Sequence, residues 1–240
     1  MIIRLFYIIL CSAFFLVQAS PAASDEPAET TLYAVGDVML GRYIDKVMKA
    51  RGSDYPFGQI TTALRSGDIV FGNLESIIST NSITPAFPEK PYNFHASREA
   101  AQALKNAGFN VMNLANNHAM DYGVVPLAET RRLLSENGIV FFGAGADINE
   151  ARQPAIIVKK GVRFGFLGYG VAHARAVYAG KNQGGIAPVV LDSIRKDISG
   201  LRGKVDTLIV SLHWGIEYSM APTKKQREEA HQIIDWGADL

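Results

Sequence analysis

The chain has 240 residues, of which 48% are hydrophobic and 20% are charged, and its 24 basic and 23 acidic residues give a formal net charge of +1. A chain of this length and composition can bury a full hydrophobic core in one large domain. The near-neutral balance argues against nucleic acid or an anionic membrane surface as a partner, although a local basic pocket for an anionic substrate stays possible.

The N-terminus has the layout of a secretory signal peptide, which we place at residues 1–19. Arg4 gives a positively charged start, an apolar run follows, and Val17 and Ala19 fit the −3 and −1 positions of a cleavage site. The run is shorter than the roughly 20 residues that span a membrane. We therefore expect export to the periplasm or another extracytoplasmic space, with an uncleaved N-terminal anchor as the alternative. Residues 20–30, rich in Ala, Pro, Glu and Ser, are expected to form a disordered tether.

Cys11 is the single cysteine of the chain and lies inside the predicted signal peptide. Cleavage after Ala19 would leave a mature protein that has no disulfide and no thiolate nucleophile or metal ligand. A metal site in that protein would have to use nitrogen and oxygen ligands.

From residue 31 onward, strand-like and helix-like segments alternate. Apolar runs predict strands at residues 31–35, 69–71, 109–112, 139–142 and 206–211. Helical patterns predict helices at residues 44–50, 97–107 (with Ser97 as N-cap and Gly108 after the end), 124–137, 189–201 and 223–236. Residues 156–160 and 162–167 flank Gly161 and predict a β-hairpin. The alternation predicts an α/β fold with a largely parallel sheet and an antiparallel part.

The last residues, Ala238, Asp239 and Leu240, follow the final predicted helix and begin what has the pattern of another strand. Natural domains seldom stop at the start of a core strand. The sequence therefore predicts that the domain formed by residues 31–240 is truncated at its C-terminus.

Polar residues gather directly after several of the predicted strands. The clusters are Gly36-Asp37, Gly72-Asn73-Leu74-Glu75, Asn116-Asn117-His118 with Asp121, and His213 with Glu217. In open α/β sheets the carboxyl ends of the strands meet at one ligand crevice, so we expect these clusters to converge. Carboxylate, amide and imidazole groups together suit Mn²⁺, Fe or Zn²⁺.

The first two clusters offer carboxylates. Asp37 is a candidate terminal metal ligand, with a helix N-cap near Gly41 as the alternative. Glu75 is a candidate ligand that bridges two metals or orients another ligand, because a bridging position benefits from negative charge. Asn73 competes with Glu75 as a polar contact to metal or substrate, or it forms an Asx-turn in a Gly-Asn-Leu-Glu turn.

The third cluster offers two different roles. The amide oxygen of Asn117 can bind a hard cation. His118 can bind a metal or donate a proton to a leaving group. Asp121 can orient the imidazole of His118, cap the helix that starts near Val124, or do both.

The remaining candidates lie at the fourth cluster and in loops. His213 ends a buried strand and is predicted to be a metal ligand, with Glu217 as its neighbour or as a substrate contact. Arg42 can clamp a substrate phosphate or carboxylate with two hydrogen bonds, or lie in solvent. His95 follows a Pro-rich loop and can contact substrate, and His173 is expected at the same rim.

The order of these motifs resembles the capsule synthesis protein CapA family. The shared pattern consists of Gly-Asp-Val-Met-Leu-Gly-Arg at 36–42, Gly-Asn-Leu-Glu at 72–75, Asn-Leu-Ala-Asn-Asn-His-Ala-Met-Asp-Tyr-Gly at 113–123, and Ser-Leu-His-Trp-Gly-Ile-Glu-Tyr at 211–218. The similarity covers residues 31–240. It implies a fold similar to that of calcineurin-like metallophosphoesterases, in which helices flank a sandwich of two β-sheets.

The resemblance also implies four ligands for one or two divalent ions: Asp37, Glu75, Asn117 and His213. His118 would be the acid near the leaving group. Met39 stands where ordinary metallophosphoesterases carry a histidine, which affects the second metal position. The family normally continues past Leu240 into a strand that ends in a Gly-His-x-x-His type motif.

The family's association with capsule and poly-γ-glutamate synthesis gives the functional prediction. We expect an exported metal-dependent hydrolase or transferase of the bacterial envelope, whose bond is a phosphoester or an amide. The alternative is a factor that assembles or exports an anionic polymer without catalysis. Expected partners are the anionic polymer or its precursor and membrane-bound capsule synthesis proteins, and nucleic acid is not expected.

Overall fold

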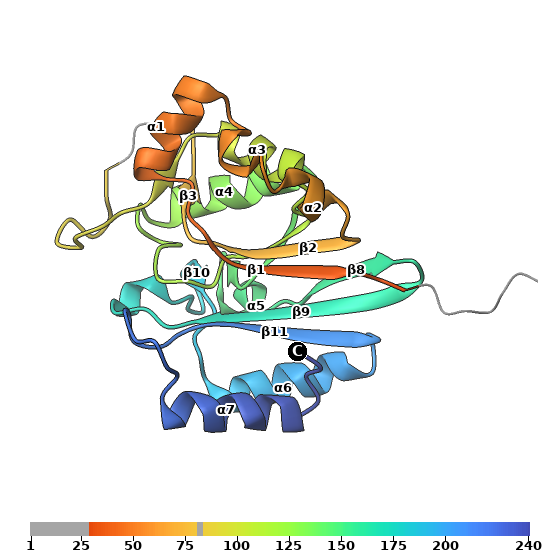
Figure 1. Ribbon diagram of the computed structural model, residues 1–240. Helices are drawn as coiled ribbons and strands as arrows, with labels where there is room; N and C mark the ends of the chain where they lie inside the picture. The colour runs from red at the N-terminus through yellow and green to blue at the C-terminus, as the bar shows by residue number, and fades with distance from the viewer. Residues whose placement is uncertain (1–28, 81–83) are drawn as a thin grey trace, which may run out of the picture.

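The computed structural model describes residues 29–80 and 84–240. The predicted signal peptide and residues 20–28 of the predicted tether lie outside the described residues. Two β-sheets lie face to face in the middle of the molecule, and helices cover the outer face of each sheet (Figure 1). The predicted α/β sandwich of two sheets flanked by helices is therefore confirmed. Within the described part of the chain, no helix combines the length and the hydropathy needed to cross a membrane.

The first sheet is fully parallel and has the strand order β1-β2-β5-β6. Its strands are β1 (Leu32–Val38), β2 (Ile69–Leu74), β5 (Val111–Asn113) and β6 (Val140–Phe142). The predicted strands are present, but β1 runs on to include Asp37, and β2 includes Asn73. The prediction of a turn at Asn73 was wrong, because pairing with both neighbouring strands keeps this residue extended.

The second sheet has the strand order β11-β9-β8. Its strands are β8 (Ala155–Lys159), β9 (Val162–Gly170) and β11 (Thr207–His213). Strands β8 and β9 form the predicted antiparallel hairpin, and β11 runs parallel to β9. On the outer side of β11, the amide of Asp239 donates to the carbonyl of Leu208 at 2.8 Å, and the amide of Val210 donates to the carbonyl of Leu240 at 2.9 Å.

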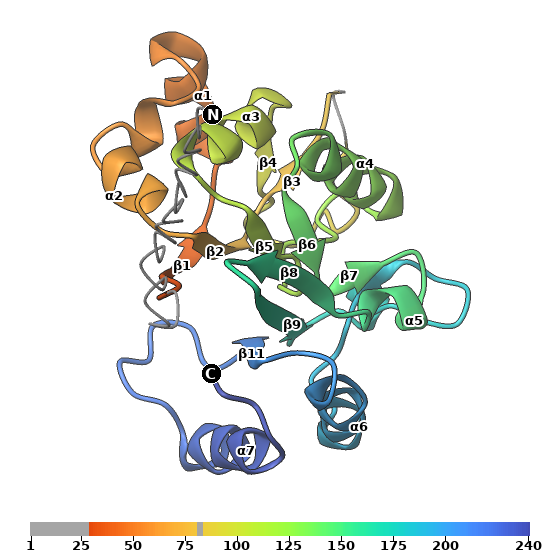
Figure 2. The same ribbon diagram turned by 90° about the vertical axis from the view of Figure 1, so that its right-hand side faces the viewer.

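The helices divide between the two sheets (Figure 2). Those over the first sheet are α1 (Arg42–Arg51), α2 (Thr61–Arg65), α3 (Glu99–Ala107) and α4 (Val124–Glu136). Those over the second sheet are α6 (Leu191–Arg202) and α7 (Lys224–Asp235). Helix α7 begins with a capping box formed by Thr223 and Gln226. Ser97 was predicted as the N-cap of α3, but Arg98 holds that position. The backbone amide of Ser97 donates to the carboxylate of Asp45 at 2.8 Å.

Smaller elements complete the fold beside these layers. They are the pair β3 (Ile77–Ile78) and β4 (His95–Ala96), the pair β7 (Ala144–Gly145) and β10 (Gly185–Ile186), the helix α5 (Ile148–Ala151), and the 3-10 turns Tyr55–Phe57 and Arg175–Val177. The β3–β4 pair is parallel and the β7–β10 pair is antiparallel.

The two sheets pack closely against each other near their carboxyl ends. Phe71, Phe142 and Phe166 meet between the sheets, with ring centroids 5.6–5.9 Å apart. Gly168 in β9 allows the close approach, because a Cβ atom there would lie 2.3 Å from Oδ1 of Asn113 and 2.7 Å from the ring of Phe142. This contact lies next to the strand ends that carry the polar clusters.

Candidate metal centre

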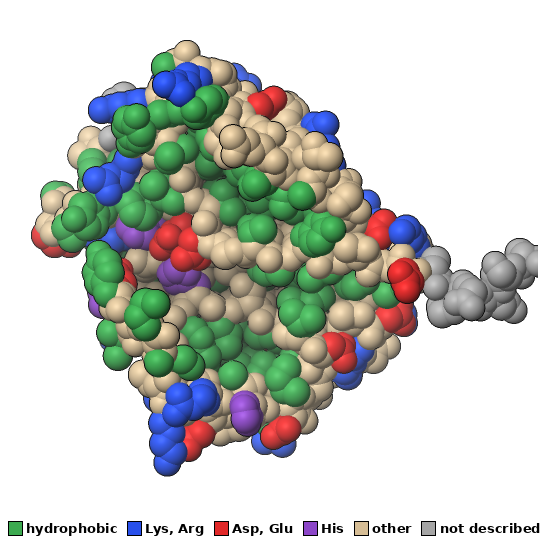
Figure 3. All heavy atoms as spheres, viewed as in Figure 1, with side chains coloured by type: hydrophobic (Ala, Val, Ile, Leu, Met, Phe, Trp, Pro, Cys, Tyr) green, Lys and Arg blue, Asp and Glu red, His purple; other side chains and the backbone are tan. Residues whose placement is uncertain are grey.

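The polar clusters gather because the strands that precede them end together. In the first sheet Asp37 pairs with Asn73, and Asn73 pairs with Asn113, so three polar side chains stand level at the carboxyl ends of β1, β2 and β5. In the second sheet His213 ends β11 beside Gly170. On the molecular surface, acidic and histidine side chains collect in a hollow at this end of the sheets (Figure 3). The two sheets thus share one site.

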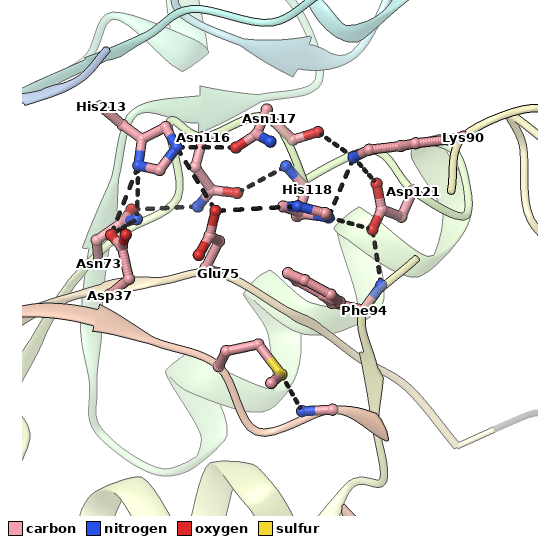
Figure 4. Close-up of polar contacts among 12 residues, drawn as sticks. Asp37, Asn73, Glu75, Lys90, Phe94, Asn116, Asn117, His118, Asp121 and His213 are labelled. Carbon is pink, nitrogen blue, oxygen red and sulfur yellow. Dashed lines mark hydrogen bonds and ion pairs between the residues drawn. The ribbon is translucent and has the colours of Figure 1, made fainter. Parts of the chain in front are cut away.

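The four predicted metal ligands come together in this hollow (Figure 4). One ligand atom each from Asp37, Glu75 and His213 lie within 4.8 Å of one another. Nδ1 of His213 is 3.5 Å from Oδ1 of Asp37, and Nε2 is 3.6 Å from Oε1 of Glu75. The amide oxygen of Asn117 is 2.8 Å from Nε2 of His213. Two carboxylates, an imidazole and an amide oxygen form a donor set that fits a divalent transition metal.

A cavity of about 420 Å³ opens over this cluster. The four predicted ligands line it together with His118. Its other walls include Tyr92, Phe94, His173, Trp214 and Glu217. The cavity is therefore polar at its base, where the ligands lie, and partly aromatic at its sides.

The ionisable groups at the base of the cavity shift one another's pKa values. A hydrogen bond with His213 lowers the pKa of Asp37 against the opposing effect of burial, and the Asn73 amide lowers it further. Burial raises the pKa of Glu75, and the charge of Asp37 raises it further. Burial by itself would lower the pKa of His213, but the hydrogen bond and charge of Asp37, together with the charge of Glu75, raise it. The cluster thus holds more negative charge than one imidazole balances, as a cation site requires.

Asp121 lies in position to orient His118, which is one of the roles predicted for this carboxylate. Nδ1 of His118 lies 2.7 Å from Oδ2 of Asp121, and Nε2 lies 3.9 Å from Oε1 of Glu75. The ring of Phe94 stacks on the imidazole at a centroid distance of 3.7 Å, and the amide of Phe94 donates to Oδ2 of Asp121 at 2.7 Å. Asp121 makes no cap for α4, where Gly123 holds the N-cap position. One edge of the imidazole therefore faces Asp121 and the other faces the cavity.

A buried amide network supports the ligands from below. The Asn73 oxygen accepts from the side-chain amides of Asn113 and Asn116, both at 3.1 Å. The Asn73 nitrogen donates to Asp37 at 2.7 Å and lies 3.1 Å from Nδ1 of His213. Asn73 is 6% exposed, so its amide is directed at the ligands rather than at the cavity. This residue holds the site together, and its geometry leaves no free group for a substrate contact.

Two further predicted substrate contacts, like Asn73, lie outside the cavity. Arg42 is exposed at the start of α1, with its guanidinium 4.8 Å from the ring centroid of Tyr92. His95 hydrogen-bonds to the hydroxyl of Ser79 at 3.0 Å, and burial lowers its pKa. Strand pairing of β4 with β3 fixes His95 in this position. The predicted candidates Glu217 and His173, in contrast, do line the cavity.

Met39 stands apart from the ligand cluster. Its sulfur accepts a hydrogen bond from the amide of Gly41 at 3.2 Å, and its side chain lines a different cavity together with Arg42. The position that carries a histidine in ordinary metallophosphoesterases thus supplies no nitrogen ligand to this cluster.

The sequence did not indicate Lys90, which is part of the site. Its ammonium nitrogen lies 2.6 Å from Oδ1 of Asp121 and 2.8 Å from the carbonyl oxygen of Asn117. A lysine between Glu89 and Pro91 in a Pro-rich loop has the pattern of a solvated surface residue. Only the path of this loop over His118 reveals the contact.

Comparison with known proteins identifies relatives of this chain by sequence. The chain is 30% identical over 247 residues to the capsule biosynthesis protein CapA of Bacillus anthracis, an alignment that covers 100% of this chain and 60% of that protein. It is 33% identical over 207 residues to the PGA biosynthesis protein CapA of Bacillus subtilis, covering 86% of this chain and 54% of that one. The chain thus spans little more than half the length of these relatives.

Solved structures show the same fold at low sequence identity. A putative 5′-nucleotidase from Staphylococcus aureus superposes with a TM-score of 0.52 at 13% identity, covering 86% of this chain and 42% of that one. The fold is thus that of the calcineurin-like metallophosphoesterases. The family described as bacterial capsule synthesis protein PGA_cap matches residues 31–240, and the chain belongs to this family.

Proposed function

We propose that this protein is a metal-dependent hydrolase or transferase that acts in the synthesis of capsule or poly-γ-glutamate at the bacterial cell surface. The observation that carries the proposal is the cluster of Asp37, Glu75 and His213 at the base of a solvent-open cavity. The process is supported by the names of the Bacillus relatives, which refer to capsule and PGA biosynthesis.

The ligands for a divalent metal would be Asp37, Glu75, Asn117 and His213. When bound, such a metal supplies Lewis-acid chemistry, which polarises the bond under attack and favours deprotonation of water. Without it, two ligand carboxylates and Glu217 make the cavity repel anions. An anionic polymer or its precursor would therefore enter only a metal-loaded site.

His118 would protonate the leaving group through Nε2, which faces the cavity and Glu75. Asp121 accepts a hydrogen bond from Nδ1 and, as a carboxylate, stabilises the charged imidazolium that a proton donor must be. Phe94 stacks on the ring and keeps water from one face. These contacts prepare His118 to deliver a proton to an oxygen or nitrogen that leaves a phosphoryl or acyl centre.

The test combines metal analysis with two chromogenic substrates, bis(p-nitrophenyl) phosphate and γ-glutamyl p-nitroanilide. We expect the purified full chain to bind Mn, Fe or Zn and to hydrolyse one of the two. His118→Ala should abolish turnover while metal content stays nearly intact, and loss of all metal would reassign His118 as a ligand. His231→Ala, a matched change of an exposed histidine in α7, should leave both readouts unchanged.

The same measurements address the non-catalytic alternative. A protein that holds no metal, turns over neither substrate and yet binds poly-γ-glutamate would be an assembly or export factor, and the enzymatic proposal would then be abandoned.

We also propose that the protein is exported and acts beside membrane-bound capsule synthesis proteins. The proposal is supported by the signal-like sequence at residues 1–19. N-terminal sequencing of the extracytoplasmic protein should then begin at Ser20. Recovery of the unprocessed chain in the membrane fraction would indicate an uncleaved anchor, and recovery in the cytoplasm would contradict export.

A further inference from the structure

Lys90 makes contacts that a solvated surface lysine does not make. Its side chain is 21% exposed, and its ammonium group lies against the fully buried carboxylate of Asp121. The same group donates to the backbone carbonyl of Asn117 at 2.8 Å and lies 3.1 Å from Nδ1 of His118 (Figure 4). One cation thus touches a predicted ligand residue, the predicted acid and the carboxylate behind that acid.

Hydrogen-bond chemistry decides how the protons are arranged here. An ammonium group has three donors and cannot accept, while an ionised carboxylate can only accept. Asp121 receives Lys90 on Oδ1, and on Oδ2 it receives the Phe94 amide and Nδ1 of His118. Nδ1 of His118 must therefore carry a proton to satisfy the 2.7 Å contact with Oδ2. In a neutral imidazole, the lone pair is then on Nε2, toward the cavity.

Lys90 also fastens the loop that covers His118. The amide of Ala86 donates to the backbone carbonyl of Asp121 at 2.8 Å, and Phe94 both donates to the Asp121 side chain and stacks on His118. Lys90 lies between these two attachment points in sequence. Its hydrogen bond to the backbone carbonyl of Asn117 attaches the loop to Asn117 as well as to Asp121.

We propose that Lys90 is a positioning residue of this site. Its ammonium group joins the carboxylate of Asp121 to the backbone carbonyl of Asn117. It thereby holds Asp121 as the acceptor that fixes the Nδ1–H tautomer of His118, and it fixes the backbone that carries the Asn117 amide. The link to turnover rests on the proposed function, but the tautomer and the placement of Asn117 are properties of the folded chain. Lys90 does not touch the reacting atoms.

The first measurement is made on the wild-type protein and needs no Lys90 variant. Long-range proton–nitrogen correlation NMR of the metal-free, histidine-labelled chain, at a pH where His118 is neutral, should show one tautomer protonated at Nδ1. The His118 signal is assigned by its absence in His118→Gln. A His118 protonated at Nε2 in the wild type would overturn the proposal, whether or not any Lys90 variant folds.

The second measurement compares Lys90→Met, Lys90→Arg and the control Lys224→Met. Met keeps the length of the lysine stem without its donors, and Arg keeps a cation with several donors. Lys224 forms an exposed ion pair with Glu228 on α7, with 84% of its side chain exposed, so its substitution removes a surface lysine of ordinary kind.

We expect Lys90→Met to mix the two tautomers and to weaken Mn²⁺ binding about 10–100-fold, the usual effect of removing a group that orients a metal ligand. Turnover should fall by a similar factor with little change in KM. Lys90→Arg should restore the tautomer and part of the affinity, and Lys224→Met should match the wild type.

The outcomes separate this inference from the proposed function. The wild type could show no turnover and yet have the Nδ1–H tautomer of His118, with Lys90→Met losing this tautomer. That result would refute the enzymatic proposal and support the positioning role of Lys90. An active wild type whose tautomer and Mn²⁺ affinity survive in Lys90→Met would refute the positioning role and keep the enzyme.

Discussion

His213 and Asn117 meet across the two sheets, with Nε2 of the imidazole 2.8 Å from the amide oxygen. His213 ends β11 in the second sheet, and Asn117 follows β5 in the first. Nδ1 of the same ring lies 3.1 Å from the amide nitrogen of Asn73 and 3.5 Å from Oδ1 of Asp37, so one imidazole contacts side chains of the first sheet on both of its edges. The candidate metal site is thus built across the junction of the sheets. A change that separates the sheets should also disperse the ligands.

Gly168→Ala tests this dependence. The new Cβ would lie 2.3 Å from Oδ1 of Asn113, so the sheets must move apart. We expect the free energy of unfolding to fall by about 1–3 kcal/mol, the usual cost of overpacking, and Mn²⁺ affinity to fall with it. Urea denaturation and metal titration measure the two effects.

Gly200→Ala is the matched control, because a Cβ at that position in α6 meets nothing within 4 Å. Alanine favours the helix, so this variant should be more stable than the wild type by about 0.5–1 kcal/mol. Equal stability of the two variants would show that sheet spacing at Gly168 is not tight.

The rule for strand ends predicted the centre of this site correctly in space. Asp37, Glu75 and Asn117 lie near or after the ends of parallel strands of the first sheet, and His213 ends β11 of the second sheet beside them. The alternation of strands and helices likewise predicted the parallel sheet and the hairpin. Such features depend on the backbone alone and can be recognised in sequence.

Residues in loops and at helix starts were harder to place from sequence. Arg42 stacks on Tyr92, and His95 is held by strand pairing with β3, although both resembled substrate contacts. Lys90 resembled a surface residue and yet contacts Asp121. The directions in which these three side chains point are decided by partners that lie far away in the sequence. Local sequence patterns contain no information about such partners.

Asp45 gives a prediction for acid stability. Burial alone would raise its pKa, but hydrogen bonds from Lys49 and Ser97 hold the pKa below the ordinary value of 3.8. The folded state then binds fewer protons than the unfolded state, so the stabilisation is complete above pH 3.8 and is lost as pH falls through the folded pKa.

Asp45→Asn should therefore cost about 1–2 kcal/mol of stability at neutral pH, and the difference from wild type should shrink below about pH 4. Urea unfolding at several pH values measures this difference. Asp192→Asn, an exposed carboxylate near the start of α6, should show a much smaller difference. A gap between Asp45→Asn and wild type that widens in acid would contradict the assignment.

The ligand carboxylates should respond in opposite ways to neutralisation in the metal-free protein. Burial and the charge of Asp37 raise the pKa of Glu75, so ionised Glu75 is unfavourable there. Glu75→Gln should stabilise the metal-free chain by roughly 0.2–1 kcal/mol, as relief of a like-charge contact does. The pKa of Asp37 is lowered by its contacts with His213 and Asn73, so Asp37→Asn should destabilise the metal-free chain.

Both variants should nevertheless bind Mn²⁺ at least about tenfold more weakly, because each removes a charged ligand. Thermal unfolding with chelator and with added Mn²⁺ measures the two effects separately. A Glu75→Gln variant that is less stable without metal yet binds Mn²⁺ as the wild type does would remove Glu75 from the ligand set.

Asp121→Asn tests the support of His118. The carboxylate is fully buried and accepts from three donors, namely Lys90, His118 and the Phe94 amide. An asparagine has one oxygen and an NH₂ group, so at least one donor would face another donor, and the Lys90 cation would lose its counter-charge. We expect a loss of about 3 kcal/mol in the free energy of unfolding and a fall in turnover of about 10–100-fold.

Asp235→Asn, an exposed position at the end of α7, should change neither quantity measurably. If Asp121→Asn instead keeps wild-type stability, the buried charge pair with Lys90 contributes nothing net, and the orientation of His118 must come from its stacking on Phe94.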